Sequence, residues 1–264
     1  MKKISALIIL GLIAICCKQG VQTPEETTPI EEVVVTKEYP EAISQIFKAH
    51  GGITNWNTIN QLQYTMDKGG DNNETHTVDL KNRNTRIEHP NYTIGRDGNG
   101  LWIAQDSTHF PVQRARFYHN LYFYFYAMPF VLGDDGITYT DVAPLSFDGK
   151  TYPGTKISYG AGVGDAPDDN YIIYLDPETN QMAWLAYTVT YGKNETSDKY
   201  SYIKYDQWQD VNGLQLPKTL QWYSVEDGKP VAMRNEQAFI NVSTSEALFA
   251  DGYFAMPENG TVVE

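Results

Sequence analysis

The segment QLQYTMDKGGDNNETHTVDLKNRNTRIEHPNYTIGRDGNGLWIA (residues 61–104) decides the fold class, because its apolar residues recur with a period of two. Leu62, Tyr64 and Met66 alternate with polar residues, as in a strand that buries one of its faces. A turn-forming cluster of glycine, aspartate and asparagine follows at 69–73, and further β-prone runs and turns come after it. This spacing predicts an antiparallel meander.

The same pattern returns in the second half of the chain. No internal repeat or second domain boundary divides it, so the sequence predicts one mainly β (α+β) domain at 38–264. A single large antiparallel sheet of roughly ten strands is expected to curve into an unclosed β-barrel. The stretch 244–249 is compatible with a capped helical turn. The β-prone runs of this half lie at 137–142, 150–159, 171–175, 181–191, 200–209, 216–225 and 229–240.

A helix is expected at the start of this domain. Pro40 and Glu41 suit a first helical turn, and Gly51 and Gly52 suit the end of the helix. His50 stands at that end, and we expect it to be a capping or core residue. A further short helical turn is expected directly after the glycines.

A second helix is predicted between the two meander halves, where the run RARFYHNLYFYFYAM (114–128) breaks the period of two and contains no turn signal. The helix should lie across the concave face of the sheet and end near Met128, before Pro129. The aromatic content would also suit a strand. One helical face collects Phe117, Leu121, Tyr124, Phe125 and Met128, and a second stripe collects Tyr118, Tyr122 and Tyr126.

Two interpretations of this aromatic helix stay open. In the first, it is a mobile lid over a hydrophobic trough, with its phenylalanine face turned inward and its tyrosine hydroxyls at the wet rim. In the second, it is a core helix that fills the half-barrel permanently. A position on the convex face of the sheet would exclude the lid.

Residues 1–16 have the layout of an export signal. Two lysines precede an almost wholly apolar run at 4–15, which is too short to span a bilayer stably. The segment 12–17 resembles a bacterial lipobox, in which a cysteine is acylated and becomes the new N-terminus. Because a small residue precedes the modified cysteine in such motifs, Cys17 is the favoured lipidation site and Cys16 is the alternative.

Residues 17–37 are expected to form the lipidated cysteine and a disordered acidic tether, since glutamates and prolines outnumber apolar residues there. The alternative is that Val33–Val35 adds an edge strand. The formal net charge of the chain is −13, and removal of the two signal-peptide lysines takes it to −15. So acidic a domain disfavours nucleic acid or a flat anionic membrane as a partner, and its membrane contact is expected to come through the lipid.

The sequence contains no recognisable catalytic or metal-binding motif. The five histidines show no zinc spacing, GxSxG is absent, and the domain at 38–264 has no cysteine. We therefore expect no catalytic residue, metal or cofactor, although paired carboxylates for glycoside cleavage stay open because their pairing is spatial. Arg114 and Arg116 open the aromatic helix at its positive end, which indicates either an anionic ligand or a solvated pair. The aspartates of the loop at 160–170 indicate either calcium binding or a mobile acidic loop.

Four short motifs resemble a known family when they are taken in order. Over residues 38–255 their order is similar to that of a family of uncharacterised exported lipoproteins with a domain of unknown function, itself related to the periplasmic lipoprotein carriers LolA and LolB. The resemblance implies an unclosed β-barrel with helices in its mouth and a concave apolar pocket suited to acyl chains. The ligand-binding arginine of those carriers cannot be placed on this sequence. The motifs are AHGG (49–52) with Trp56, YTIG (92–95) with Trp102, AMPF (127–130) and VNGLQLP (211–217).

These features predict a non-enzymatic lipoprotein of a bacterial envelope, anchored in the outer membrane of a Gram-negative cell. It is expected to bind a lipid, an acyl chain or a lipoprotein anchor in the half-barrel. The alternatives are a structural or assembly lipoprotein that binds a protein partner, and an envelope lipid or glycan hydrolase. The residues expected to line the pocket are Trp102, Phe117, Leu121, Phe125, Met128 and Phe130.

Overall fold

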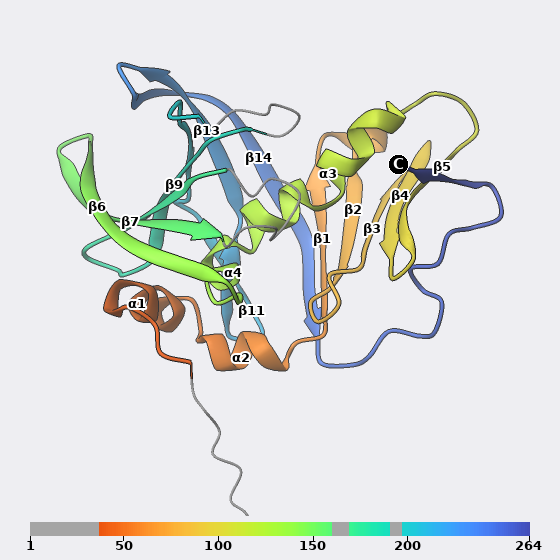
Figure 1. The fold of residues 1–264 in the computed structure, drawn as a ribbon, viewed down its shortest axis with the longest axis horizontal. Coiled ribbons are helices and arrows are strands. Elements are labelled where there is room, and N and C mark those ends of the chain that lie inside the picture. The colour runs from red at the N-terminus through yellow and green to blue at the C-terminus, as the bar shows by residue number, and fades with distance from the viewer. Residues whose placement is uncertain (1–36, 160–168, 191–196) are drawn as a thin grey trace, which may run out of the picture. The chain divides into compact units, whose positions relative to one another are not determined.

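A 13-stranded antiparallel sheet dominates the computed structural model, which describes residues 37–159, 169–190 and 197–264 (Figure 1). Residues 38–264 form one compact unit. Several predicted features lie outside the described residues: the signal peptide at 1–16, the candidate lipidation sites Cys16 and Cys17, the tether up to residue 36 with its alternative strand at Val33–Val35, and residues 160–168 of the acidic loop.

The strands fall into two meanders separated by the inserted helices. The first meander contains β1 (Gln61–Asp67), β2 (Glu74–Asp79), β3 (Thr85–His89), β4 (Tyr92–Asp97) and β5 (Gly100–Gln105). The second contains β6 (Ile137–Phe147), β7 (Lys150–Tyr159), β8 (Tyr171–Leu175), β9 (Met182–Tyr187) and β10 (Ser201–Lys204), and the sheet is completed by β13 (Thr219–Glu226), β14 (Lys229–Ser245) and β15 (Gly260–Val263). A separate hairpin consists of β11 (Trp208–Val211) and β12 (Leu214–Pro217).

Strand β14 joins the two meanders, because it pairs with β1 on one side and with β13 on the other. Strand β15 lies at one edge of the sheet against β5, and β6 forms the opposite edge. Within the described residues these two edge strands do not pair with each other, so the sheet stays open. The prediction of a mainly β domain built on one open antiparallel sheet is confirmed.

The structure corrects several predicted boundaries. The expected strand at 200–209 is divided into β10 and β11, and the one at 216–225 into β12 and β13. The hairpin β11–β12 turns at Asn212 and Gly213, whose φ angles of 54° and 80° are the positive values that a tight hairpin turn needs. Pairing of β11 with β12 satisfies backbone hydrogen-bonding groups of both strands outside the main sheet.

The prediction of a helical turn at 244–249 is wrong, because β14 continues to Ser245. Gln61 pairs with Ser245 and Leu62 pairs with Thr244, so Thr244 and Ser245 are paired with strand β1 and do not start a helical turn. Strand β15 was not predicted, because four residues are too few to show a period. It forms through pairing with β5, in which Val263 lies opposite Leu101.

The predicted helices are present. His50 caps the first of them and is fully buried, as expected. Its Nδ1–H donates to the Gln215 carbonyl at 2.9 Å, and its Nε2 accepts from the Met182 amide at 3.1 Å. Burial lowers the pKa of His50 to about 4, although the hydrogen bond to Gln215 opposes this shift. The helical elements are α1 (Glu41–Ala49), α2 (Ile53–Thr58), the 3₁₀ turn η1 (Gly70–Asn72), α3 (Val112–Tyr126) and α4 (Met128–Val131).

Helix α3 lies on the concave face of the sheet, as predicted (Figure 1). One core cluster joins α3 and α4 to strands of both meanders, including Leu62 of β1 and Ile157 of β7. A second cluster joins Ala115 of α3 to Leu101 of β5 and its neighbours. A third cluster contains Trp184 of β9. The next residue, Leu185, belongs to the main core cluster inside the sheet, and side chains alternate along a strand, so Trp184 lies on the outer face. The sheet therefore wraps around α3 and α4.

Candidate functional site

The C-terminal end of α3 and the following α4 fill the inner end of the trough. Phe125, Met128 and Phe130 are only 5%, 0% and 1% exposed. The Phe130 ring stacks on Trp56 with 4.5 Å between ring centroids, and the Phe125 ring lies 4.8 Å from Tyr187. These three predicted pocket residues are brought together by the fold, inside a part of the trough that the protein fills itself.

The other three predicted pocket residues have different surroundings. Phe117 and Leu121 are half-buried on α3, and Leu121 packs against the main core cluster. Trp102 lies on the outer face of β5, because its neighbour Leu101 faces α3 and side chains alternate along a strand. Its indole N–H donates to the Phe254 carbonyl at 3.0 Å. The structure does not bring Trp102 together with the other five.

The burial of the tyrosine stripe disagrees with the lid interpretation of α3. That interpretation placed the tyrosine hydroxyls at the wet rim, but Tyr118 is 9% exposed and Tyr126 is fully buried. The reason is that the sheet beneath α3 is not wholly apolar. It carries the carboxylate of Glu74, which accepts a hydrogen bond from the Tyr118 hydroxyl.

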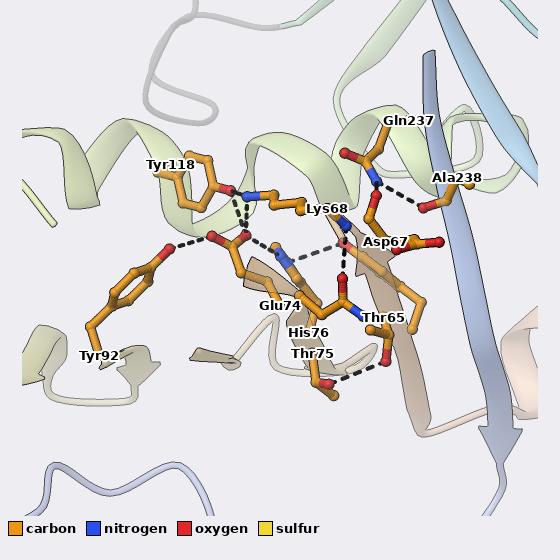
Figure 2. Close-up of polar contacts among 12 residues, drawn as sticks. Thr65, Asp67, Lys68, Glu74, Thr75, His76, Tyr92, Tyr118, Gln237 and Ala238 are labelled. Atoms are coloured by element: carbon orange, nitrogen blue, oxygen red, sulfur yellow. Dashed lines mark hydrogen bonds and ion pairs between the residues drawn. The ribbon is translucent and has the colours of Figure 1, made fainter. Parts of the chain in front are cut away.

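Four residues surround that carboxylate and form with it a polar cluster between α3 and the sheet. We call this the Glu74 cluster, and its members are Lys68, Glu74, His76, Tyr92 and Tyr118 (Figure 2). Glu74 and His76 are two residues apart on β2, so both face α3. Glu74 Oε2 lies 2.7 Å from Lys68 Nζ, 2.5 Å from the Tyr118 hydroxyl and 3.3 Å from His76 Nε2. The Tyr92 hydroxyl donates to Oε1.

The electrostatics of the Glu74 cluster fix its protonation. Burial alone would raise the pKa of Glu74, but hydrogen bonds from His76, Lys68 and Tyr118 outweigh it and hold that pKa well below its ordinary value. Burial lowers the pKa of His76 and raises the pKa values of Tyr92 and Tyr118. The cluster therefore contains an ionised carboxylate beside an ammonium group, with a neutral imidazole and two neutral phenols.

Both carboxylate oxygens of Glu74 already accept hydrogen bonds from other residues of the Glu74 cluster. Lys68 also donates to the Tyr118 hydroxyl at 2.8 Å, and Tyr64 on β1 donates to His76 Nδ1 at 3.4 Å. A general base needs an oxygen free for a substrate proton, and both oxygens of Glu74 accept from protein groups instead. The arrangement holds α3 against β2.

On the other side of α3, a cavity of about 620 Å³ lies between the helix and the sheet. We call it the α3 cavity. Its floor is one cross-strand row, in which each residue is directly paired with the next: Val78 on β2, Thr85 on β3, Arg96 on β4, Leu101 on β5 and Val263 on β15. Its roof is one helical face of α3, with Arg116, His119, Asn120, Phe123 and Tyr124. Arg83 stands at its side.

Both polar and apolar groups face this cavity. Three of the six arginines of the chain, Arg83, Arg96 and Arg116, line it. Arg83 pairs with Asp134 at 2.6 Å, and its guanidinium lies 5.0 Å from the centre of the Phe123 ring. Thr85 is 3% exposed, and its Oγ1 has no hydrogen-bond partner among the described residues; the same is true of Arg83 Nη1.

Sequence reasoning found one member of this cavity and missed the others. Arg116 was noted because arginine opposes the helix dipole at the positive end of a helix. The floor residues Thr85 and Arg96 gave no signal, because each belongs to a different short strand and only the register places them side by side. For the Glu74 cluster, a signal did exist: two charged or polar residues, Glu74 and His76, occupy positions of β2 that alternation assigns to the buried face.

Other candidate sites receive little support. No group of three or more histidine, cysteine, aspartate or glutamate side chains suited to a metal occurs in the described residues. Asp169, beside the undescribed part of the acidic loop, is buried and accepts from the backbone N–H and hydroxyl of Thr190 at 2.7 and 2.8 Å. Among the helices that the structure describes, none is both long and apolar enough to cross a membrane.

Comparisons with known proteins place the chain among proteins of unknown role. Residues 102–237 match a family of unknown function, DUF6503. No curated protein matches the chain. Similar solved structures include a DUF1329 family protein from Desulfovibrio piger, with 10% identity, a TM-score of 0.45 and coverage of 81% of this chain and 95% of that one.

Two further structures are similar at about the same level. A LolA superfamily protein from Nitrosomonas europaea has 10% identity and a TM-score of 0.40. A domain from Vibrio parahaemolyticus described as an outer membrane lipoprotein-sorting protein domain has 5% identity and a TM-score of 0.36. Each comparison covers 74% of this chain and 87% of the other.

Proposed function

The chain belongs to the family of unknown function DUF6503, and from that premise we propose that it is a non-enzymatic, membrane-anchored lipoprotein of a bacterial envelope that binds a hydrophobic ligand in the α3 cavity. The anchor would be a lipid on Cys17, or on Cys16, in the outer membrane of a Gram-negative cell. The ligand would be a lipid or an acyl chain.

The observation that carries this proposal is the α3 cavity itself. Its volume of about 620 Å³ lies in the range of small-molecule sites. Val78, Leu101 and Val263 give it an apolar floor, and Phe123 gives it an apolar roof. These side chains belong to the core clusters that continue beneath α3, so an acyl chain in the cavity would exchange water for apolar contacts.

Burial of apolar surface would supply the affinity. At roughly 25 cal/mol per Å² of apolar surface, an acyl chain gains several kcal/mol before ordering costs are subtracted. The acyl chain would lie under the part of α3 between Arg116 and Tyr124. Phe117 and Leu121 follow on the neighbouring side of the helix, and Phe125, Met128 and Phe130 close the inner end of the trough.

A structural or assembly role is the second candidate. The observation that favours it is the near-complete burial of Phe125, Met128 and Phe130, because a trough filled by its own helix serves as a scaffold without any ligand. The protein would then bind a partner through its outer surface. The hydrolase alternative lacks comparable support, since the carboxylate oxygens of Glu74 are occupied.

Ligand binding can be tested on residues 38–264, which form one compact unit. The protein is purified without detergent, analysed by native mass spectrometry, and titrated with a fluorescent fatty acid. Asn120→Trp places a large ring in the cavity from the roof, and we expect it to weaken probe binding at least tenfold. Gln113→Trp is the matched control, because Gln113 lies on α3 with its side chain exposed.

A stoichiometric lipid in the native mass, together with lost binding in Asn120→Trp alone, would support the proposal. A clean mass without lipid and no probe binding by the unsubstituted protein would refute it. Cross-linking to a protein partner in intact cells would then test the assembly role.

A further inference from the structure

A second cavity, of about 260 Å³, lies on the outer face of the sheet, on the side away from α3. We call it the outer-face pocket. Its floor crosses three strands, because Gln63 of β1 is paired with Thr77 of β2 on one side and with Ser243 of β14 on the other. Leu62 and Tyr64, the neighbours of Gln63, belong to the core cluster inside the sheet, so alternation places Gln63 on the outer face.

The wall of the outer-face pocket is the segment 247–254, part of the connection between β14 and β15 (Figure 1). It contributes Leu248, Phe249, Ala250 and Tyr253 to the lining. The rings of Phe249 and Tyr253 have centroids 4.9 Å apart. Tyr253 is 36% exposed and Leu248 is 80% exposed, so this wall offers aromatic and apolar surface to a ligand on the floor.

Hydrogen bonds hold the wall in place at both of its ends. At the first end, Gln61 Nε2 donates to the Ala247 carbonyl at 2.9 Å. At the second end, the Trp102 indole N–H donates to the Phe254 carbonyl at 3.0 Å, and the buried Phe254 ring lies 4.7 Å from the Phe249 ring. The pocket therefore has its shape before a ligand arrives, which lowers the entropic cost of binding.

The floor of the pocket offers hydrogen-bonding groups without charge. Gln63 Nε2 donates to the Thr77 hydroxyl at 3.1 Å, so this amide, like that of Gln61, has a fixed orientation. No hydrogen bond from a described residue reaches the Oε1 atoms of these two amides or the hydroxyl of Ser243. Among the described residues that line the pocket, none is charged, although the chain has a formal net charge of −13. These groups suit a neutral ligand that both donates and accepts hydrogen bonds.

Other classes of ligand fit this pocket less well. An acyl chain would cover the amides and hydroxyls of the floor without replacing their hydrogen bonds to water, which costs free energy. An added peptide strand needs unpaired backbone groups, but β1 is paired with β2 on one side and with β14 on the other. A charged ligand would lack a counter-charge in the lining.

We propose that the outer-face pocket binds a neutral saccharide. A pyranose ring has a face of C–H groups, whose partial positive charge suits the negative face of an aromatic ring. The hydroxyls around the same ring both donate and accept hydrogen bonds. The C–H face stacks on Tyr253, and the hydroxyls bond to Gln61, Gln63 and Ser243. This site lies on the opposite face of the sheet from the α3 cavity and goes beyond the proposed function.

Saturation-transfer difference NMR on residues 38–264 tests this proposal. The probes are methyl β-D-glucopyranoside, methyl β-D-galactopyranoside, methyl α-D-mannopyranoside and methyl N-acetyl-β-D-glucosaminide. We expect at least one of them to bind with a Kd of about 1 mM, the affinity that one stacked ring and a few hydrogen bonds supply. Saturation should be strongest on the hydrogens of one ring face.

Two compounds serve as controls for the chemistry of the ligand. Sorbitol offers similar hydroxyl groups on an open chain that has no ring face to stack. Capped trialanine offers neutral donors and acceptors without a ring. Neither compound should bind measurably under the conditions in which a glycoside binds.

Substitutions assign glycoside binding to the outer-face pocket. Ser243→Trp fills the pocket from its floor and should abolish binding, and Ser146→Trp is the matched control because Ser146 is exposed on the edge strand β6. Tyr253→Leu keeps an apolar side chain without the ring, and we expect it to weaken binding about fivefold. Tyr253→Phe retains the ring and should lose less affinity than Tyr253→Leu. Thermal melting confirms that each variant is folded.

Lack of binding by every glycoside would overturn the saccharide site. Equal binding of sorbitol would overturn the stacked ring, and equal binding of capped trialanine would identify a peptide site instead. A folded Ser243→Trp variant that keeps full glycoside binding would also overturn the assignment. None of these results bears on ligand binding in the α3 cavity, which lies on the other face of the sheet.

Discussion

Glu74 links the stability of the sheet to the position of α3. Its carboxylate is 1% exposed and lies among donors from β1–β2, from β4 and from α3. An ionised group buried in this way is stable only while its partners are present. Removal of any one partner leaves the others poorly compensated, so the cluster behaves as a unit.

Glu74→Gln should destabilise the protein by about 3 kcal/mol, because Lys68 then loses its counter-charge in a buried setting. Urea unfolding followed by circular dichroism measures the change. Glu88→Gln is a suitable control, since Glu88 pairs with Arg86 at the surface, where substitutions change stability by about 0.5 kcal/mol or less. Equal losses in the two variants would contradict the assigned role of Glu74.

His50 makes stability depend on pH. Its pKa in the folded protein is about 4, below the value of about 6.5 in an unfolded chain. As pH falls, the unfolded chain therefore takes up the proton first, so the stability that neutral His50 contributes is present above pH 6.5 and lost toward pH 4. Burial lowers the pKa of His76 as well, so it acts in the same direction.

His50→Gln should reduce the slope of unfolding free energy against pH by about 1.4 kcal/mol per pH unit between pH 6 and pH 4.5. Glutamine offers a donor and an acceptor for Gln215 and Met182 but binds no proton in this range. Urea titrations at several pH values provide the measurement. An unchanged slope would mean that His50 does not titrate on unfolding.

At the scale of elements, the two sides of α3 have different surroundings. Its tyrosine side is hydrogen-bonded to the sheet, and its other side roofs the α3 cavity. Tyr118→Phe should therefore loosen the helix without breaking the core, at a cost of about 1.5 to 3 kcal/mol for a hydrogen bond to a charged group. Hydrogen exchange should accelerate in α3 and stay slow in β8 and β9. Tyr152→Phe, at a buried tyrosine of the outer-face cluster, should leave exchange in α3 unchanged.

The end of α1 is fixed by its contact with the β11–β12 hairpin. Gly51 has a φ of +98°, and a Cβ there would lie 2.1 Å from the Gly213 carbonyl oxygen. Gly52 has a φ of +92° but open space around it. Both Gly51→Ala and Gly52→Ala should incur the backbone strain of about 1 to 2 kcal/mol, and Gly51→Ala should cost roughly 2 kcal/mol more because the hairpin must move. Equal melting temperatures would contradict this contact.

At the scale of the whole unit, β1 and β14 form the seam on which both meanders depend. β1 is covered by the Glu74 cluster and by core residues of α3, and no other strand pair connects the two meanders in the described chain. We expect the slowest hydrogen exchange at Leu62, Tyr64 and Met66 of β1, and fast exchange in the edge strands β6 and β15. Faster exchange in β1 than in β6 would indicate that the meanders unfold separately.

The sequence by itself determined the fold class and most of the secondary structure. The period of two around Leu62, Tyr64 and Met66 was sufficient for the sheet, and the glycines at 51 and 52 were sufficient for the end of α1. These signals are local, because alternation and backbone conformation depend on neighbouring residues. The aromatic run at 114–128 was likewise sufficient for a helix.

Only the tertiary structure decided which side of that helix faces inward and which residues meet across the sheet. The lid interpretation turned the apolar face that contains Phe117 inward, yet the buried carboxylate of Glu74 gave the tyrosine side a polar partner. Thr85, Arg96 and Arg116 come from two strands and a helix, and their meeting follows from strand register and helix rotation. Both quantities are set by contacts between distant segments, so no local pattern in the sequence encodes the cavity that those three residues share.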